Sequence, residues 1–228
     1  MRRCLAAILV VGLVSLTSRD AAAQPSEKDL VAYAALTLTP VGSHVPMTMP
    51  KANAFGLRLS HFAQEGTDGT NNLAGSYFMK AGSNALVGAT AGYIMPGCDG
   101  CDGVFNAGLN LSSTLWSSTG GANVGLSGDL GWAKEDDVTA LSAAIGVPLG
   151  FSIQQASKST VSFFVQPAFG YGRLSAAGES ESGTRPIIGA GAAWTAAGGW
   201  GLHAAFNKVM IEEGGNTFGV GFSYKLGN

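Results

Sequence analysis

Residues 217–224, TFGVGFSY, alternate strictly between two kinds of side chain. Phe218, Val220, Phe222 and Tyr224 are large and apolar, whereas the residues between them are Thr, Gly, Gly and Ser. Successive side chains of a β-strand point to opposite faces, so this period predicts a strand with one apolar face and one small, polar face. Residues 105–111, 124–132 and 161–171 show the same alternation.

The alternation predicts ten strands over the chain, most of them about 9 to 15 residues long. They are residues 54–62, 72–81, 84–94, 104–116, 122–132, 138–152, 160–174, 186–195, 200–210 and 216–226. Globular strands average ~5 to 6 residues, while a tilted strand that crosses a membrane needs ~9 to 11. The predicted fold is therefore all-β, a closed antiparallel up-and-down transmembrane β-barrel of ten strands, with eight or twelve as alternatives. Pro148 and Pro167 predict bulges or breaks within two strands.

The composition agrees with a barrel and excludes several other classes of protein. Hydrophobic residues make up 46% of the 228, charged residues only 12%, and there are 34 glycines. After the N-terminal segment, no stretch reaches the ~18 to 20 apolar residues of a spanning helix. The net charge of −2 argues against a nucleic-acid partner, which would need phosphate neutralisation.

The N-terminus predicts export from the cytoplasm. Arg2 and Arg3 precede a charge-free apolar run, residues 4–17, and residues 21–23 are three alanines that suit a cleavage site. This is the anatomy of a secretory signal peptide. We expect residues 1–23 to be the signal peptide, residues 24–53 a lead-in segment, and residues 54–228 the barrel.

The connections between the predicted strands differ on the two rims. Eleven of the 15 acidic residues fall in the five links that follow odd-numbered strands: Glu65, Asp68, Asp99, Asp102, Glu135, Asp136, Asp137, Glu179, Glu181, Glu212 and Glu213. The other links are short and mostly uncharged. Longer polar loops on one rim and tight turns on the other are typical of outer-membrane barrels, with the loops outside and both termini periplasmic.

Residues 54–226 resemble the small bacterial outer-membrane β-barrel proteins. The resemblance rests on the signal peptide, the alternation, the glycine-rich strands and the aromatic final segment FGVGFSYKL. It implies location in the outer membrane, with outer-membrane lipid as a partner. No family-specific motif is matched, so no functional residue is carried over. The chain departs from these proteins in ending on Gly227-Asn228 and not on an aromatic residue.

A few ionisable residues fall on the face opposite the apolar one, which the fold turns toward the lumen. They are Arg58, Lys80, Asp129, His203 and Lys225. Charged side chains inside a membrane generally face inward and find partners, so Arg58 and Asp129 are candidates to meet across the barrel. Either they set the selectivity of a small pore, or they form a structural ion pair that helps to plug the lumen.

Three further groups of residues are candidate sites. Cys98 and Cys101 in an exported loop predict a local disulfide; two cysteines with no nearby histidine make a poor zinc site. Arg173, Arg185 and Lys208 lie toward the loop rim and are candidates for contact with outer-leaflet phosphate groups, or are ordinary interfacial cations. No Ser/His/acid set or phosphate-binding glycine loop is recognisable, so we expect neither catalytic residues nor a cofactor.

Two functions remain open from the sequence. The first is a non-enzymatic outer-membrane barrel, either a narrow passive channel or a surface protein that presents its acidic loops to solutes or partners. The second is a soluble exported β-barrel that binds a small apolar ligand. We expect a monomer.

Overall fold

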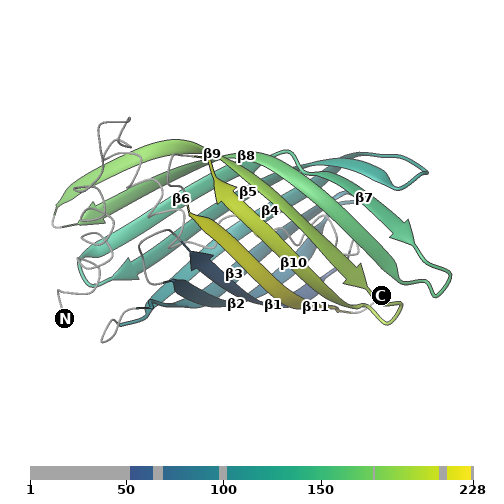
Figure 1. Cartoon of the computed structure of the whole chain (residues 1–228), viewed down its shortest axis with the longest axis horizontal. Helices are drawn as coiled ribbons and strands as arrows, with labels where there is room; N and C mark the ends of the chain where they lie inside the picture. Colours follow the sequence, from purple (N-terminus) through teal and green to yellow (C-terminus); the bar gives the residue numbers. More distant parts are fainter. Residues whose placement is uncertain (1–51, 64–68, 98–101, 177, 211–214, 227–228) are drawn as a thin grey trace.

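The computed structural model describes residues 52–63, 69–97, 102–176, 178–210 and 215–226, and these form eleven β-strands (Figure 1). In the part of the chain that the structure describes, no helix is long and apolar enough to cross a membrane. The strands are β1 (Ala54–Ala63), β2 (Thr70–Ala81), β3 (Ala85–Met95), β4 (Val104–Ser117), β5 (Ala122–Glu135), β6 (Val138–Gly146), β7 (Leu149–Gln154), β8 (Thr160–Ala176), β9 (Glu179–Thr195), β10 (Trp200–Val209) and β11 (Asn216–Lys225).

The strands close into an antiparallel barrel. Each strand pairs with its neighbours in sequence except β6 and β7, which do not pair with each other. β1 also pairs with β11 along its whole length, from Ala54↔Lys225 to Ala63↔Asn216. β6 and β7 together occupy one position between β5 and β8. The barrel therefore has the ten strand positions that the alternation predicts, and the sheet has no free edge along the ring.

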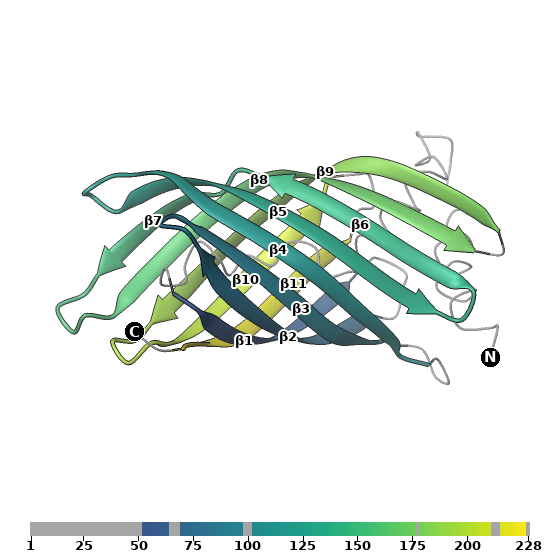
Figure 2. The same cartoon turned by 180° about the vertical axis from the view of Figure 1, so that it is seen from behind.

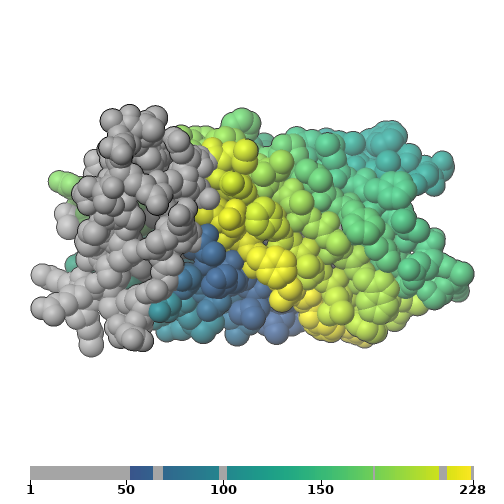
Figure 3. Space-filling view, in the orientation of Figure 1, coloured from purple at the N-terminus to yellow at the C-terminus, as the bar shows by residue number. Residues whose placement is uncertain are grey.

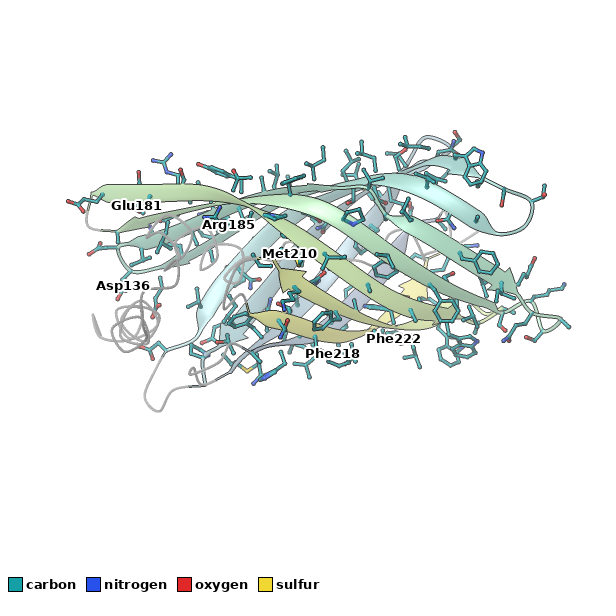
Figure 4. The ribbon with its side chains drawn as sticks, turned by 45° about the horizontal axis from the view of Figure 1, so that its top comes forward. Asp136, Glu181, Arg185, Met210, Phe218 and Phe222 are labelled. Atoms are coloured by element: carbon teal, nitrogen blue, oxygen red, sulfur yellow. The ribbon has the colours of Figure 1, made fainter. Side chains whose placement is uncertain are left out.

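The alternation sorts the side chains between the outside and the inside of the barrel. The large apolar residues stay exposed on the outer surface; Leu109, Leu130 and Phe169 are 55%, 55% and 61% exposed. Phe218 and Phe222 point outward from β11 in Figure 4, and Figure 3 shows this side as a continuous outer wall. The buried residues of the inner face are largely Gly, Ala, Ser, Thr and Asn. An apolar outside around a polar inside is the reverse of a soluble barrel.

Two prolines interrupt the ladder at one place. Val147 and Pro148 separate β6 from β7, while the neighbouring Pro167 stays within β8 and pairs with Ile188 of β9. Val147 donates its N–H to the carbonyl of Pro167, and Gly125 donates to the carbonyl of Pro148. A proline has no backbone N–H, so neither proline can donate a hydrogen bond back to its partner. The pairs Val147–Pro167 and Gly125–Pro148 therefore each have one backbone hydrogen bond where a ladder pair could have two. The break expected at Pro148 is confirmed, whereas Pro167 leaves β8 continuous. A further irregularity, which the sequence did not predict, lies between Thr114 and Trp116.

The predicted first residue of the eighth strand, residue 186, is wrong, because β9 begins at Glu179. Residues 175–185 were expected to form a long acidic link, but β8 and β9 continue as a hairpin to the pair Ala176↔Glu179. Glu135 likewise ends β5 opposite Val138. Both faces of these segments are polar, so hydrophobic alternation could not reveal them as strands. Two of the five loop-rim links are consequently tight turns on extended hairpins.

The barrel wall is uneven in height. β1, β10 and β11 have 10 residues each, whereas β8 and β9 have 17 each. Residues 179–186 of β9 extend past Ile187, the last residue paired with β10. We call β1, β10 and β11 the short wall and β5 to β9 the tall wall. Figure 1 shows the β8–β9 hairpin reaching beyond β10 and β11, and Figure 2 shows the opposite side.

Candidate functional site inside the barrel

Apolar side chains close in on the lumen near each rim. Ala54, Phe78 and Leu86 form a buried cluster where β1 begins and β2 ends, near the short turns. A second cluster lies toward the loop rim and consists of Ile94, Val104, Ala133, Ala140 and Leu174. Between these clusters the inward-facing residues are small or polar, and the barrel has a band of polar side chains at mid-depth.

A chain of hydrogen bonds runs around this band from β2 to β5. Thr90 Oγ1 donates to Asn110 Oδ1 over 2.8 Å, and Asn110 Nδ2 donates to Asp129 Oδ1 over 2.6 Å. Because the Thr90 proton is committed to Asn110, Ser76 Oγ donates to Thr90 Oγ1, 2.8 Å away. Every donor thus points toward the carboxylate of Asp129, which is 5% exposed. Aligned donors that end on a charged acceptor strengthen one another.

The short wall carries two cationic or potentially cationic side chains in the same band. His203 of β10 pairs with Gly221 of β11, and Gly221 pairs with Arg58 of β1, so the three form one row across the wall. The His203 ring lies against Gly221, where any Cβ would meet its Nε2 and Cε1 atoms. Arg58 Nε and His203 Nε2 are buried and have no hydrogen-bond partner among the described residues.

Arg58 and Asp129 interact electrostatically across the barrel, and Arg58 also repels a charge on His203. The sequence placed Arg58, Asp129 and His203 on the inner face by strand parity alone, and all three lie there. The site therefore has a positive side on the short wall and a negative side on the tall wall. Opposite charges on facing walls create a field across the lumen.

Large inward-facing rings are held against the wall by glycines. The ring of Phe78 lies where a Cβ on Gly88 would be, and the ring of Phe164 lies likewise against Gly191. The His203 ring covers Gly221 in the same way. A side chain at any of these glycines would force the neighbouring ring away from the wall, so glycine lets these rings lie flat.

The remaining predicted residues lie away from the polar band. Lys80 is exposed at the turn rim, where its backbone N–H donates to Asn53 Oδ1 over 3.0 Å, and Lys225 ends β11 on the same rim. Arg173 and Lys208 are exposed on the outer face near the loop rim. Arg185 lies on the inward side of the β8–β9 hairpin, which does not favour its predicted contact with lipid (Figure 4). Cys98 and Cys101 lie outside the described residues.

Sequence reasoning missed Ser76, Thr90 and Asn110, the residues that connect Asp129 to the wall. Their one signal is that each lies on the inner face by parity, a property they share with many other small polar residues. Among the described residues, no group of three or more His, Cys, Asp or Glu side chains could hold a metal ion.

No protein-family model matches the chain, and no curated protein sequence matches it. Several solved structures resemble its fold. An outer-membrane channel from Pseudomonas putida is 9% identical over 78% of this chain and 97% of that one, with a TM-score of 0.49. The β domain of the Bordetella autotransporter BrkA is 14% identical, over 77% and 100%, with a TM-score of 0.41. The outer-membrane enzyme PagL is 9% identical, over 75% and 99%, with a TM-score of 0.37.

The backbone pairing and the outer surface of the barrel show that it spans a membrane. All backbone groups of a membrane-spanning sheet must pair internally, which the closure of β1 on β11 achieves. Aromatic side chains stand outward toward both rims: Phe151, Trp200 and Tyr224 near the turns, and Tyr93, Trp132 and Tyr171 near the loops. Trp194 packs edge-on against Trp200 with ring centroids 4.8 Å apart. These are the interfacial girdles of a transmembrane barrel.

The chain is a transmembrane β-barrel protein with the fold seen in outer-membrane barrels. The soluble alternative required an apolar interior for its ligand, and the polar band at mid-depth is unsuited to that role.

Proposed function

We propose that this protein is a non-enzymatic, monomeric, narrow passive channel for small polar solutes. The observation that carries the proposal is the pair of opposite charges, Arg58 and Asp129, held at mid-depth on facing walls. Ionisable residues within a membrane are expensive to bury and generally mark a solute or ion pathway. The donors aligned on Asp129 and the buried Arg58 Nε make a fixed, polar lining at mid-depth, which supports the passage of a small polar solute.

The test is the ion selectivity of the purified protein in a planar bilayer. We expect small, steady conductance steps in a KCl gradient. Arg58→Gln removes the positive side of the lumen and shifts the reversal potential toward cation selectivity. Asp129→Asn removes the negative side and shifts the reversal potential toward anion selectivity.

Matched controls carry the same charge changes outside the lumen. Lys208→Gln removes a positive charge from the outer face of β10, and Asp137→Asn removes a negative charge from the β5–β6 turn. Neither should change the selectivity appreciably. A folded wild-type barrel without conductance, or the same shift from the lumen and control variants, would refute the channel.

A second candidate function is surface presentation, and the extension of β9 beyond β10 favours it. Residues 179–186 carry Glu179, Glu181 and Arg185 on a hairpin that stands above the short wall. If presentation is the function, deletion of residues 176–180 should abolish binding of whole cells to a partner while leaving the conductance unchanged. If the channel is the function, Arg58→Gln changes solute uptake and the deletion does not.

A further inference from the structure

An apolar groove of about 590 Å³ crosses the outside of the barrel where β4 meets the tall wall. Its sides are formed by Leu109, Leu111, Leu126, Leu130, Ile145 and Phe169. These residues belong to β4, β5, β6 and β8, and the wall formed by β4, β5 and β6 faces the reader in Figure 2. The volume lies within the ~300 to 1,000 Å³ of small-molecule pockets.

The groove exists because two small residues interrupt two rows of large ones. Gly128 stands between Leu111 and Ile145 in one row of paired residues. Ala143 stands between Leu130 and Tyr171 in the next row. A Cβ on Gly128 would have only the carbonyl oxygen of Ala144, 4.0 Å away, within contact distance. The wall therefore has open space at Gly128, and no neighbouring side chain fills it.

A cationic side chain stands at the loop-rim end of the groove. Tyr171 and Thr184 line that end, and Arg173 follows Tyr171 by two residues on the same outward face of β8. Same-face neighbours on a strand are about 7 Å apart. The guanidinium is held by a 3.0 Å hydrogen bond from Nη2 to Ser180 Oγ. Asp129 is the one acidic residue that lines the groove, and it contributes from the inner side, where its carboxylate bonds Asn110.

We propose that the groove binds an acyl chain of a phosphate-bearing membrane lipid, whose phosphate contacts Arg173. The groove lies within the apolar belt, so hydrocarbon chains are the phase that surrounds it. A groove that fits one acyl chain holds that chain in an ordered conformation against the protein. The positive charge of Arg173 favours a lipid whose headgroup carries a phosphate. This site is independent of the lumen and of the proposed channel.

The structure offers a variant that fills the groove without disturbing the wall. Gly128→Leu places a side chain in the open space between Leu111 and Ile145. Gly75→Leu is its matched control. Gly75 also faces outward, on β2, and a Cβ there would meet nothing within 4 Å. Both variants add one leucine to the lipid-facing surface, and only the first adds it to the groove.

The experiment is native mass spectrometry of the full mature barrel in detergent with added lipid. Phosphatidylglycerol is the probe, and diacylglycerol with the same chains is the phosphate-free comparison. We expect one retained phosphatidylglycerol per wild-type barrel. Gly128→Leu should reduce retention of both lipids about tenfold, equivalent to ~1.4 kcal/mol, and Gly75→Leu should leave both unchanged. Arg173→Gln should lower phosphatidylglycerol to the level of diacylglycerol, while Lys208→Gln should not.

The outcomes separate a site from general solvation by lipid. If Gly128→Leu and Gly75→Leu have equal effects, the groove holds no preferred chain and the proposal is wrong. If Arg173→Gln leaves the preference for phosphatidylglycerol intact, the headgroup assignment is wrong. Heat-dependent migration of each variant on gels confirms that the barrel is folded before lipid retention is compared.

Discussion

The two sides of the barrel differ in how their buried polar groups are hydrogen-bonded. On the side that leads to the tall wall, Ser76, Thr90 and Asn110 pass hydrogen bonds from strand to strand until they end on Asp129. On the short wall, Arg58 Nε and His203 Nε2 are buried without a hydrogen-bond partner in the part of the chain that the structure describes. The network that ends on Asp129 is therefore bonded within the protein, although Asn106 Oδ1 of β4 and Asn123 Oδ1 of β5 are also buried without a partner among the described residues. At mid-depth on the short wall, two polar nitrogens face the lumen without such a bond.

The difference suggests a division of labour within one barrel. An unpaired buried polar group lowers the free energy of unfolding by about 1 to 3 kcal/mol. Contact with water or solute in the lumen removes this cost. A fully bonded network instead fixes side-chain positions and stabilises the wall. The tall wall should therefore be sensitive to substitution in stability, and the short wall in conductance.

The largest loss in the free energy of unfolding is expected at Gly121, where the β4–β5 turn contacts β7 at the turn rim. Gly121 has φ +95°, and a Cβ there would strike the backbone oxygen of Ser152 on β7. Gly121→Ala should lower the free energy of unfolding by about 3 kcal/mol, from backbone strain and forced displacement together. Urea unfolding in detergent micelles measures the loss.

Gly82 provides the control for this substitution in the β2–β3 turn. Its φ is +79°, but a Cβ there would meet nothing within 4 Å. Gly82→Ala should cost only about 1 to 2 kcal/mol, the strain of the left-handed conformation. Equal losses at Gly82 and Gly121 would show that contact with Ser152 contributes nothing.

Most of the wall could be predicted from the sequence, because lipid requires an apolar residue at every second position. The predicted strands 54–62 and 200–210 differ from β1 and β10 by one residue at one end. Beyond the bilayer that requirement ends, and so residues 179–185 of β9 were mistaken for a loop. Parity also placed Arg58 and Asp129 inside the barrel. The bonds from Asn110 to Asp129 and from Ser76 to Thr90 join directly paired residues, so they depend on the exact register between strands. The bond from Thr90 to Asn110 connects residues that are not directly paired across β3 and β4, and register alone does not reveal it.

The second-largest effect is expected at Asn110, the residue that donates to Asp129. Asn110→Leu leaves the buried carboxylate without this donor and Thr90 without its acceptor. Hydrogen bonds to charged groups contribute about 1.5 to 3 kcal/mol, so we expect a loss of about 2 to 3 kcal/mol in the same unfolding assay.

A double variant shows whether that loss of stability arises because the Asp129 carboxylate has lost the Asn110 donor. Asp129→Leu by itself also removes the counter-charge of Arg58, so the informative comparison is the cost of Asn110→Leu with and without Asp129. Asn110→Leu should cost less in the Asp129→Leu background than in the wild type. If the two substitutions are instead additive, Asn110 does not stabilise Asp129.

A smaller effect is expected at Ser76, where the chain of donors begins. Ser76 donates to Thr90 and is two bonds away from the carboxylate. Ser76→Ala removes one neutral hydrogen bond from a half-buried position, and about 0.5 to 1 kcal/mol should be lost. A loss at Ser76 as large as that at Asn110 would mean that the network acts as a single unit and does not weaken with distance from Asp129.

The smallest effect is expected on the short wall, at His203. His203→Phe keeps a flat ring against Gly221 and removes the buried Nε2, which no described residue bonds. Removing an unsatisfied polar atom is neutral or stabilising, so the unfolding midpoint should stay unchanged or rise. The conductance should nevertheless change, because a polar atom that faces the lumen has become a carbon. A loss of stability comparable to that of Asn110→Leu would place His203 in a bonded network of its own, and the two walls would then no longer differ in kind.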